Sequence, residues 1–158
     1  MEPSAKLVFS NPVHFLAFGF GSGLAPFAPG TFGTLAAVPL YLLMQPLSLP
    51  LYLAVVVVAF VAGIWICGAA GTDLGVHDHG GIVWDEFVGL WVTMIAAPVG
   101  WQWIVIGFLL FRLFDIWKPW PIGWADQQLS GGLGVMLDDV IAGVYAFIVL
   151  QIIVQLTR

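Results

Sequence analysis

The sequence has very little charge. Only 8% of its 158 residues are Asp, Glu, Lys or Arg, and 61% are hydrophobic, whereas an ordinary soluble domain carries about 25% charged residues. Basic residues are especially scarce, because four Lys and Arg stand against nine Asp and Glu, for a formal charge of −5. This composition excludes an ordinary soluble monomer, and the lack of a basic patch excludes a nucleic acid partner.

Cysteine and the usual nucleophile motifs are also scarce. The single Cys67 lies in an apolar run, so no disulfide forms within one chain and the thiol is expected to be a small buried group. The sequence has no G-x-S-x-G elbow, no cysteine followed by a basic phosphate loop and no Asp-x-Asp-x-Thr motif. Catalysis through a covalent serine, cysteine or aspartyl intermediate of those types is therefore not expected.

Long uncharged segments predict membrane-spanning helices over residues 51–70 and 140–156, since about 20 apolar residues cross the hydrocarbon core. Residues 34–44 form a shorter apolar segment, and the turn at 45–50 joins it to the first span as an antiparallel hairpin. Residues 1–11 are polar and do not resemble a cleavable signal peptide. The predicted fold class is all-α, a small multi-pass membrane helical bundle in which residues 1–158 form a single domain.

The uncharged stretch 87–111 allows two topologies. One tilted helix of this length would span roughly 37 Å and separate Asp85 and Glu86 from Asp115. Two shorter helices broken at Pro98–Gly100 would bring the same carboxylates together. We favour the broken or re-entrant pair, because proline removes a backbone donor and the following glycine weakens the helix further.

The acidic residues are concentrated in the middle of the chain. Eight of the nine lie between Asp73 and Asp139, where Arg112 and Lys118 are the only Lys or Arg residues, so this stretch carries 2 − 8 = −6. On the favoured topology these residues share one face with Lys6, and only Arg158 lies opposite. The positive-inside rule then predicts an acidic site on the cytoplasmic face of the membrane.

Residues 73–86 hold the densest group of titratable side chains, namely Asp73, His77, Asp78, His79, Asp85 and Glu86. This stretch is either a functional site or a solvated loop between helices. Each of the two histidines has either a catalytic or a structural role. The stretch contains no Lys or Arg, so clustered carboxylates near lipid require water, protons or metal ions to offset their repulsion. Carboxylate oxygens suit Mg²⁺, which pairs readily with substrate phosphate.

Three further groups are candidates for the same site. Arg112, Asp115 and Lys118 are spaced to share a helix face, either as an ion pair with interfacial anchors or as an anion-binding group with a metal ligand. Asp138 and Asp139 follow a glycine-rich stretch, where they cap a helix or ligate metal. The glycine-rich segment 19–34 offers either a connecting loop or an oxyanion nest.

Several motif blocks occur in a fixed order: Gly21–Leu24 with Ala28–Thr31; Gly75–Gly80 with Ile82–Phe87; Phe111–Arg112, Asp115 and Trp117–Pro121; and Gly131–Gly132 with Asp138–Val140. Together they resemble the phosphatidylglycerophosphatase A family from about Asn11 to the last predicted helix. The resemblance implies a Mg²⁺-dependent phosphoric monoester hydrolase of the cell inner membrane. Its reaction would convert phosphatidylglycerophosphate to phosphatidylglycerol and inorganic phosphate, the last step of phosphatidylglycerol synthesis.

The residues suggest a division of roles. Metal ligands are expected among Asp73, Asp78, Asp85, Glu86, Asp138 and Asp139; catalytic groups among Asp78, Asp85, Glu86, Asp115, His77 and His79; and substrate phosphate contacts among Arg112, Lys118, Ser22, Thr31 and Thr34. The alternative functions are a small carrier or channel for divalent cations that uses the same carboxylates, and a structural subunit. Membrane lipids are the expected surroundings, and we infer no obligate protein partner.

Overall fold

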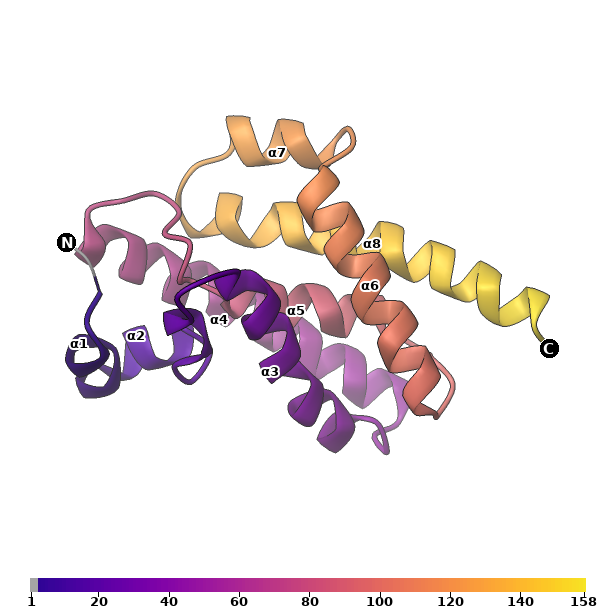
Figure 1. Cartoon of the computed structure of the whole chain (residues 1–158). Helices are drawn as coiled ribbons and strands as arrows, with labels where there is room; N and C mark the ends of the chain where they lie inside the picture. Colours follow the sequence, from indigo (N-terminus) through magenta and orange to yellow (C-terminus); the bar gives the residue numbers. More distant parts are fainter. Residues whose placement is uncertain (1–2) are drawn as a thin grey trace.

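The computed structural model describes residues 3–158, and this part of the chain is entirely helical, without strands (Figure 1). The elements are α1 (Ala5–Ser10), α2 (Pro12–Ala17), the short 3₁₀ helix η1 (Ser22–Leu24), α3 (Pro29–Met44), α4 (Leu49–Leu74), α5 (Trp84–Thr93), α6 (Trp101–Trp117), α7 (Ile122–Gln128) and α8 (Gly131–Leu156). The predicted all-α class is confirmed.

Within residues 3–158, two helices, α4 and α8, are long and apolar enough to cross a membrane, each with 26 residues. Both predicted spans therefore lie inside helices that extend further than the apolar runs. The two helices cross closely at Gly132, where an added Cβ would lie 1.7 Å from the carbonyl oxygen of Ile64. Glycine at this position is what allows the backbones to approach.

The short helix α5 lies at the centre of the bundle and packs against α8, α4 and α3. Gly89 on α5 and Gly143 on α8 permit this contact, because a Cβ on Gly143 would lie 2.6 Å from the Gly89 carbonyl oxygen. Nearly all of α5 is buried, although Asp85 and Glu86 stand in its first turn. With ten residues, α5 is too short to span a bilayer.

The helix pair expected between residues 87 and 111 is confirmed, since α5 and α6 are separated by residues 94–100. Positive φ angles at Ala96 (55°) and Gly100 (146°) turn the chain, and Pro98 lies between them. The pair brings the C-terminal half of α6 beside the first turn of α5, because Arg112, which pairs with Asp115, lies 3.9 Å from Glu86.

Two helix boundaries differ from the sequence predictions. Helix α3 begins at Pro29, whose fixed φ suits a first helical position, so Thr31 and Thr34 lie inside the helix. Helix α8 begins at Gly131, so Asp138 and Asp139 lie about two turns inside it and do not cap its start. The glycine-rich residues 131–134 that precede these acids are part of the helix, and Gly132 is where α8 contacts α4.

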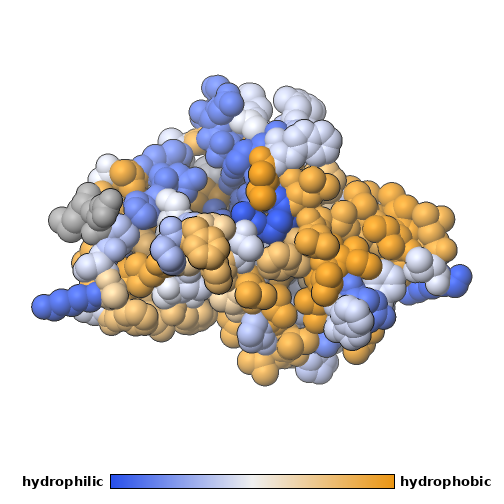
Figure 2. Space-filling view, in the orientation of Figure 1, coloured by the Kyte–Doolittle hydropathy of each residue, from blue (hydrophilic) through white to orange (hydrophobic). Residues whose placement is uncertain are grey.

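Polar and apolar surfaces are separated along the molecule. Figure 2 shows hydrophobic residues covering the part formed by α6 and the C-terminal half of α8. Hydrophilic residues gather toward α7 and line a hollow near the centre of the view.

Candidate active site

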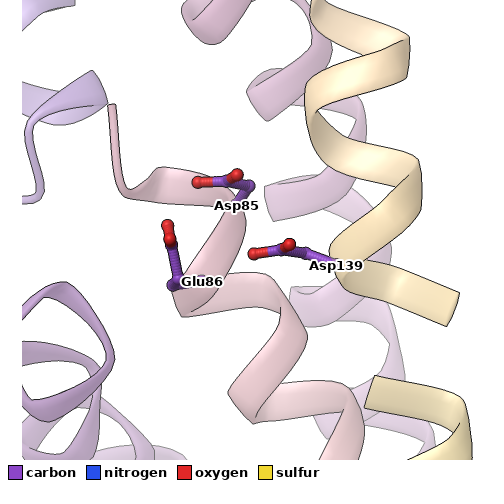
Figure 3. Close-up of side chains that lie close together, drawn as sticks. All are labelled: Asp85, Glu86 and Asp139. Atoms are coloured by element: carbon purple, nitrogen blue, oxygen red, sulfur yellow. The ribbon is translucent and has the colours of Figure 1, made fainter. Parts of the chain in front are cut away.

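Three buried carboxylates form the centre of the site. Asp85 and Glu86 on α5 and Asp139 on α8 each offer an oxygen, and these oxygens all lie within 4.8 Å of one another. Figure 3 shows the three side chains directed toward a common point. Asp85 is 6% exposed and Asp139 2% exposed, so little water reaches the cluster.

The cluster is electrostatically unfavourable without a cation. Burial raises the pKa of Asp85 and of Glu86 well above the usual carboxyl range, and neighbouring carboxylates add to the increase. One oxygen on each of Asp85, Glu86 and Asp139 is buried without a hydrogen-bond partner among the described residues. Buried acceptors of this kind are normally satisfied, so the donor set fits a hard divalent cation such as Mg²⁺.

Arg112 borders this cluster. Its guanidinium hydrogen-bonds Asp115 one turn along α6, and its Nη1 lies 3.9 Å from Oε1 of Glu86. The helix α3 closes the same space, because a Cβ on Gly30 would lie 2.7 Å from Glu86 Oε1 and 3.2 Å from Arg112 Nη1. Of the two arrangements expected for Arg112 and Asp115, the structure has the ion pair, and Lys118 does not join it. The Nε of Arg112 is buried without a described partner.

Lys118 forms a second charged group beside the first. At the end of α6 it adopts φ 54°, and its Nζ lies 2.9 Å from Asp138 Oδ2 and 3.3 Å from Asp126 Oδ1. Asp138 is 4% exposed, whereas its neighbour Asp139 points to the carboxylate cluster. The sequence alone predicts the same role for these two adjacent acids, but in the structure they have different partners.

The other predicted acids lie outside the three-carboxylate cluster. Asp73, near the end of α4, pairs with the buried His14 of α2, whose Nε2 lies 3.0 Å from Asp73 Oδ2. Asp78 lies on the exposed α4–α5 connection. Partial desolvation by the surrounding protein raises the pKa of Asp78, with a further increase from Asp126.

Both histidines of the α4–α5 connection accept a hydrogen bond from the backbone through Nδ1. His77 accepts from the Gly131 N–H at 3.2 Å, and His79 from the Gly81 N–H at 2.9 Å. Each imidazole, when neutral, therefore carries its proton on Nε2. The two rings line different clefts, so they serve different parts of the surface.

The three predicted hydroxyl contacts do not share one environment. Ser22 donates to the Gly19 carbonyl at 2.7 Å, and the fully buried Thr34 donates to the Gly30 carbonyl at 2.7 Å. Both protons thus stabilise backbone geometry. Thr31 is half-buried in the first turn of α3, one residue after Gly30.

Comparison with known proteins identifies the family. Residues 15–154 match the family model described as phosphatidylglycerophosphatase A. The chain belongs to the phosphatidylglycerophosphatase A family. The phosphatidylglycerophosphatase A of Escherichia coli (strain K12) is 52% identical over 141 residues, which cover 89% of this chain and 82% of that protein. The phosphatidylglycerophosphatase A of Haemophilus influenzae (strain Rd) is 48% identical over 150 residues, covering 94% and 92%. No solved structure matches the chain.

Membership of the phosphatidylglycerophosphatase A family confirms the resemblance found from the sequence motifs, and with it a phosphatase activity. The structure adds partners that the motifs did not indicate. His14 holds Asp73, Asp126 shares Lys118, and Gly30 contacts the Glu86–Arg112 pair. The periodicity and spacing of the sequence do not predict these contacts, because each one depends on how separate helices pack.

Proposed function

We propose that this protein hydrolyses the terminal phosphate of phosphatidylglycerophosphate, giving phosphatidylglycerol and inorganic phosphate. Family membership supports the activity and the substrate named for its relatives. The observation that carries the proposal within the structure is the buried cluster of Asp85, Glu86 and Asp139 beside Arg112. A site this acidic binds an anionic ester poorly unless a cation is present.

We infer that Asp85, Glu86 and Asp139 hold Mg²⁺. Bound there, the ion would neutralise phosphate charge and lower the pKa of the attacking water. The support is the set of buried oxygen donors without partners and the absence of described Cys or His side chains from the cluster. Hard oxygen ligands favour Mg²⁺ over zinc.

The remaining residues have roles that follow from their contacts. Arg112, fixed by Asp115, supplies a cation at the edge of the cluster and is the proposed phosphate contact. Gly30 leaves the space between Glu86 and Arg112 open to a ligand, because any side chain there would fill it. A carboxylate oxygen left free by the metal is a suitable general base for the attacking water.

The decisive experiment measures phosphate release by the purified protein from phosphatidylglycerophosphate in detergent micelles. We expect release with Mg²⁺, loss of release with EDTA, and recovery when Mg²⁺ is added back. Cation flux across proteoliposomes without phosphate release would instead identify a carrier. If the protein shows neither phosphate release nor cation flux, it is a structural subunit.

We propose that the protein spans the inner membrane several times with this site on the cytoplasmic face. The support is the length of α4 and α8 and the distribution of the cations. Lys118 contacts Asp138 in the first half of α8 and Arg112 lies beside Glu86, whereas Arg158 follows the opposite end of α8. A cysteine at position 78, in a variant lacking Cys67, should react with an impermeant maleimide only after cells are opened. Labelling in intact spheroplasts would contradict this orientation.

A further inference from the structure

A separate pocket lies beside the carboxylate cluster. It has a volume of about 380 Å³, and its lining includes Leu24, Pro26, Pro29, His79, Gly80 and Gly81. None of these residues is acidic, although the chain as a whole carries −5. Among the described lining residues, the pocket is thus free of the carboxylates that dominate the neighbouring site.

His79 gives this pocket a hydrogen-bond donor with a defined direction. Its Nδ1 accepts from the Gly81 N–H at 2.9 Å, and its ring lies 5.8 Å from that of the buried Phe18. The proton of the neutral imidazole is therefore on Nε2, which has no partner among the described residues. A donor that is held in place but unpaired is suited to an anionic ligand.

The pocket adjoins the cluster through consecutive residues of α3. Pro29 lines the pocket, and the next residue, Gly30, is the one whose Cβ would lie 2.7 Å from Glu86 Oε1. Adjacent Cα atoms are about 3.8 Å apart, so the pocket wall is one residue away from the carboxylate cluster. The two spaces are therefore bordered by neighbouring residues of one helical turn, a separation on the scale of two anionic groups joined by a short linker.

The connection between η1 and α3, residues 25–28, also exposes an apolar side chain. Phe27 follows Pro26 of the pocket wall and is 68% exposed, and its ring packs edge-to-face against Phe32 at 5.4 Å. Two exposed aromatic rings beside the pocket that holds His79 suit a lipid whose head enters the pocket while its chains remain in the bilayer.

We propose that this pocket binds the phosphodiester of the lipid substrate, with His79 Nε2–H as donor, while the terminal phosphate lies at the carboxylate cluster. The inference rests on the proposed function, because that substrate carries two phosphates separated by one glycerol. It assigns His79 to substrate binding and specificity. Protonation of the leaving oxygen is then not its role.

The test compares two replacements of His79. His79→Asn keeps an acceptor for the Gly81 N–H but lacks a donor at the Nε2 position, whereas the amide of His79→Gln reaches that position. We expect His79→Asn to raise the KM for phosphatidylglycerophosphate about tenfold, and to weaken competitive inhibition by the product phosphatidylglycerol by a similar factor. Inhibition by inorganic phosphate should not weaken in parallel, and His79→Gln should restore most of the loss.

A second variant tests the pocket without altering the histidine. A Cβ on Gly80 meets nothing within 4 Å, so Gly80→Leu adds bulk at the pocket wall without strain. It should weaken phosphatidylglycerol inhibition, whereas Gln128→Leu, at an exposed position on α7, should not. This pair keeps the test valid if a histidine variant does not fold.

The outcomes separate the two levels of inference. Wild-type protein that releases no phosphate contradicts the proposed function. Normal wild-type release, with phosphatidylglycerol inhibition unchanged in both His79→Asn and Gly80→Leu, contradicts the pocket assignment alone. A fall in kcat in His79→Asn, with KM and product inhibition unchanged, would instead make His79 a general acid and overturn the inference.

Discussion

Replacing Asp139 by Asn, or Glu86 by Gln, should reduce phosphate release at least about 10³-fold, and added Mg²⁺ should not restore it. Each change keeps the shape of the side chain but removes one charge from a cluster whose oxygens lie within 4.8 Å of one another. The cation that offsets substrate charge would then be lost or displaced. Rates measured at increasing Mg²⁺ concentration distinguish weak metal binding from a site that no longer works.

In the absence of metal, the same variants should be at least as stable to unfolding as the wild type. Removing one of several buried, mutually repelling carboxylates lowers the electrostatic cost of folding. Wild-type protein should gain thermal stability when Mg²⁺ is added, and the variants should gain little. Asp126→Asn is the matched control, since it removes a carboxylate from the same end of the molecule but outside the cluster. Normal turnover in Glu86→Gln at saturating Mg²⁺ would exclude Glu86 as a ligand.

The sequence predicted the helical class and the helix pair because both depend on local chemistry. Long uncharged runs require helices in lipid, and the Pro98–Gly100 break removes helical hydrogen bonds wherever it occurs. Helix starts were predicted less well. Gly131–Gly134 has the composition of a loop, yet these residues are helical because a second helix packs on them at Gly132.

The sequence predicted which types of residue form the site, but it did not predict which side chains contact one another. An excess of acids between residues 73 and 139 indicated a cation site without separating ligands from paired carboxylates. Asp138 and Asp139 are adjacent in sequence, but successive residues of a helix point about 100° apart. One therefore faces Lys118 and the other faces α5, a division that the packing of α5, α6 and α7 against α8 determines.

Replacement of Lys118 should cause a large loss of stability. Lys118→Met should destabilise the protein by about 2–4 kcal/mol, because it leaves the buried Asp138 without its cation. Burial disfavours the charged form of Lys118, but the hydrogen bond with Asp138 and the field of Asp126 outweigh it and raise the pKa of Lys118. The ammonium thus stays protonated at neutral pH and the pair persists.

Asp138→Asn in the Lys118→Met background should recover most of that stability, since the uncompensated carboxylate is removed and its shape is kept. Thermal unfolding in detergent of the wild type, both single variants and the double variant gives the coupling energy between the two side chains. If Lys118 instead serves mainly to bind phosphate, as expected from the sequence, the single and double variants would share a raised KM with little coupling in stability. A large coupling energy would assign Lys118 to holding α6 and α7 against α8, which leaves Arg112 as the cation that meets the substrate.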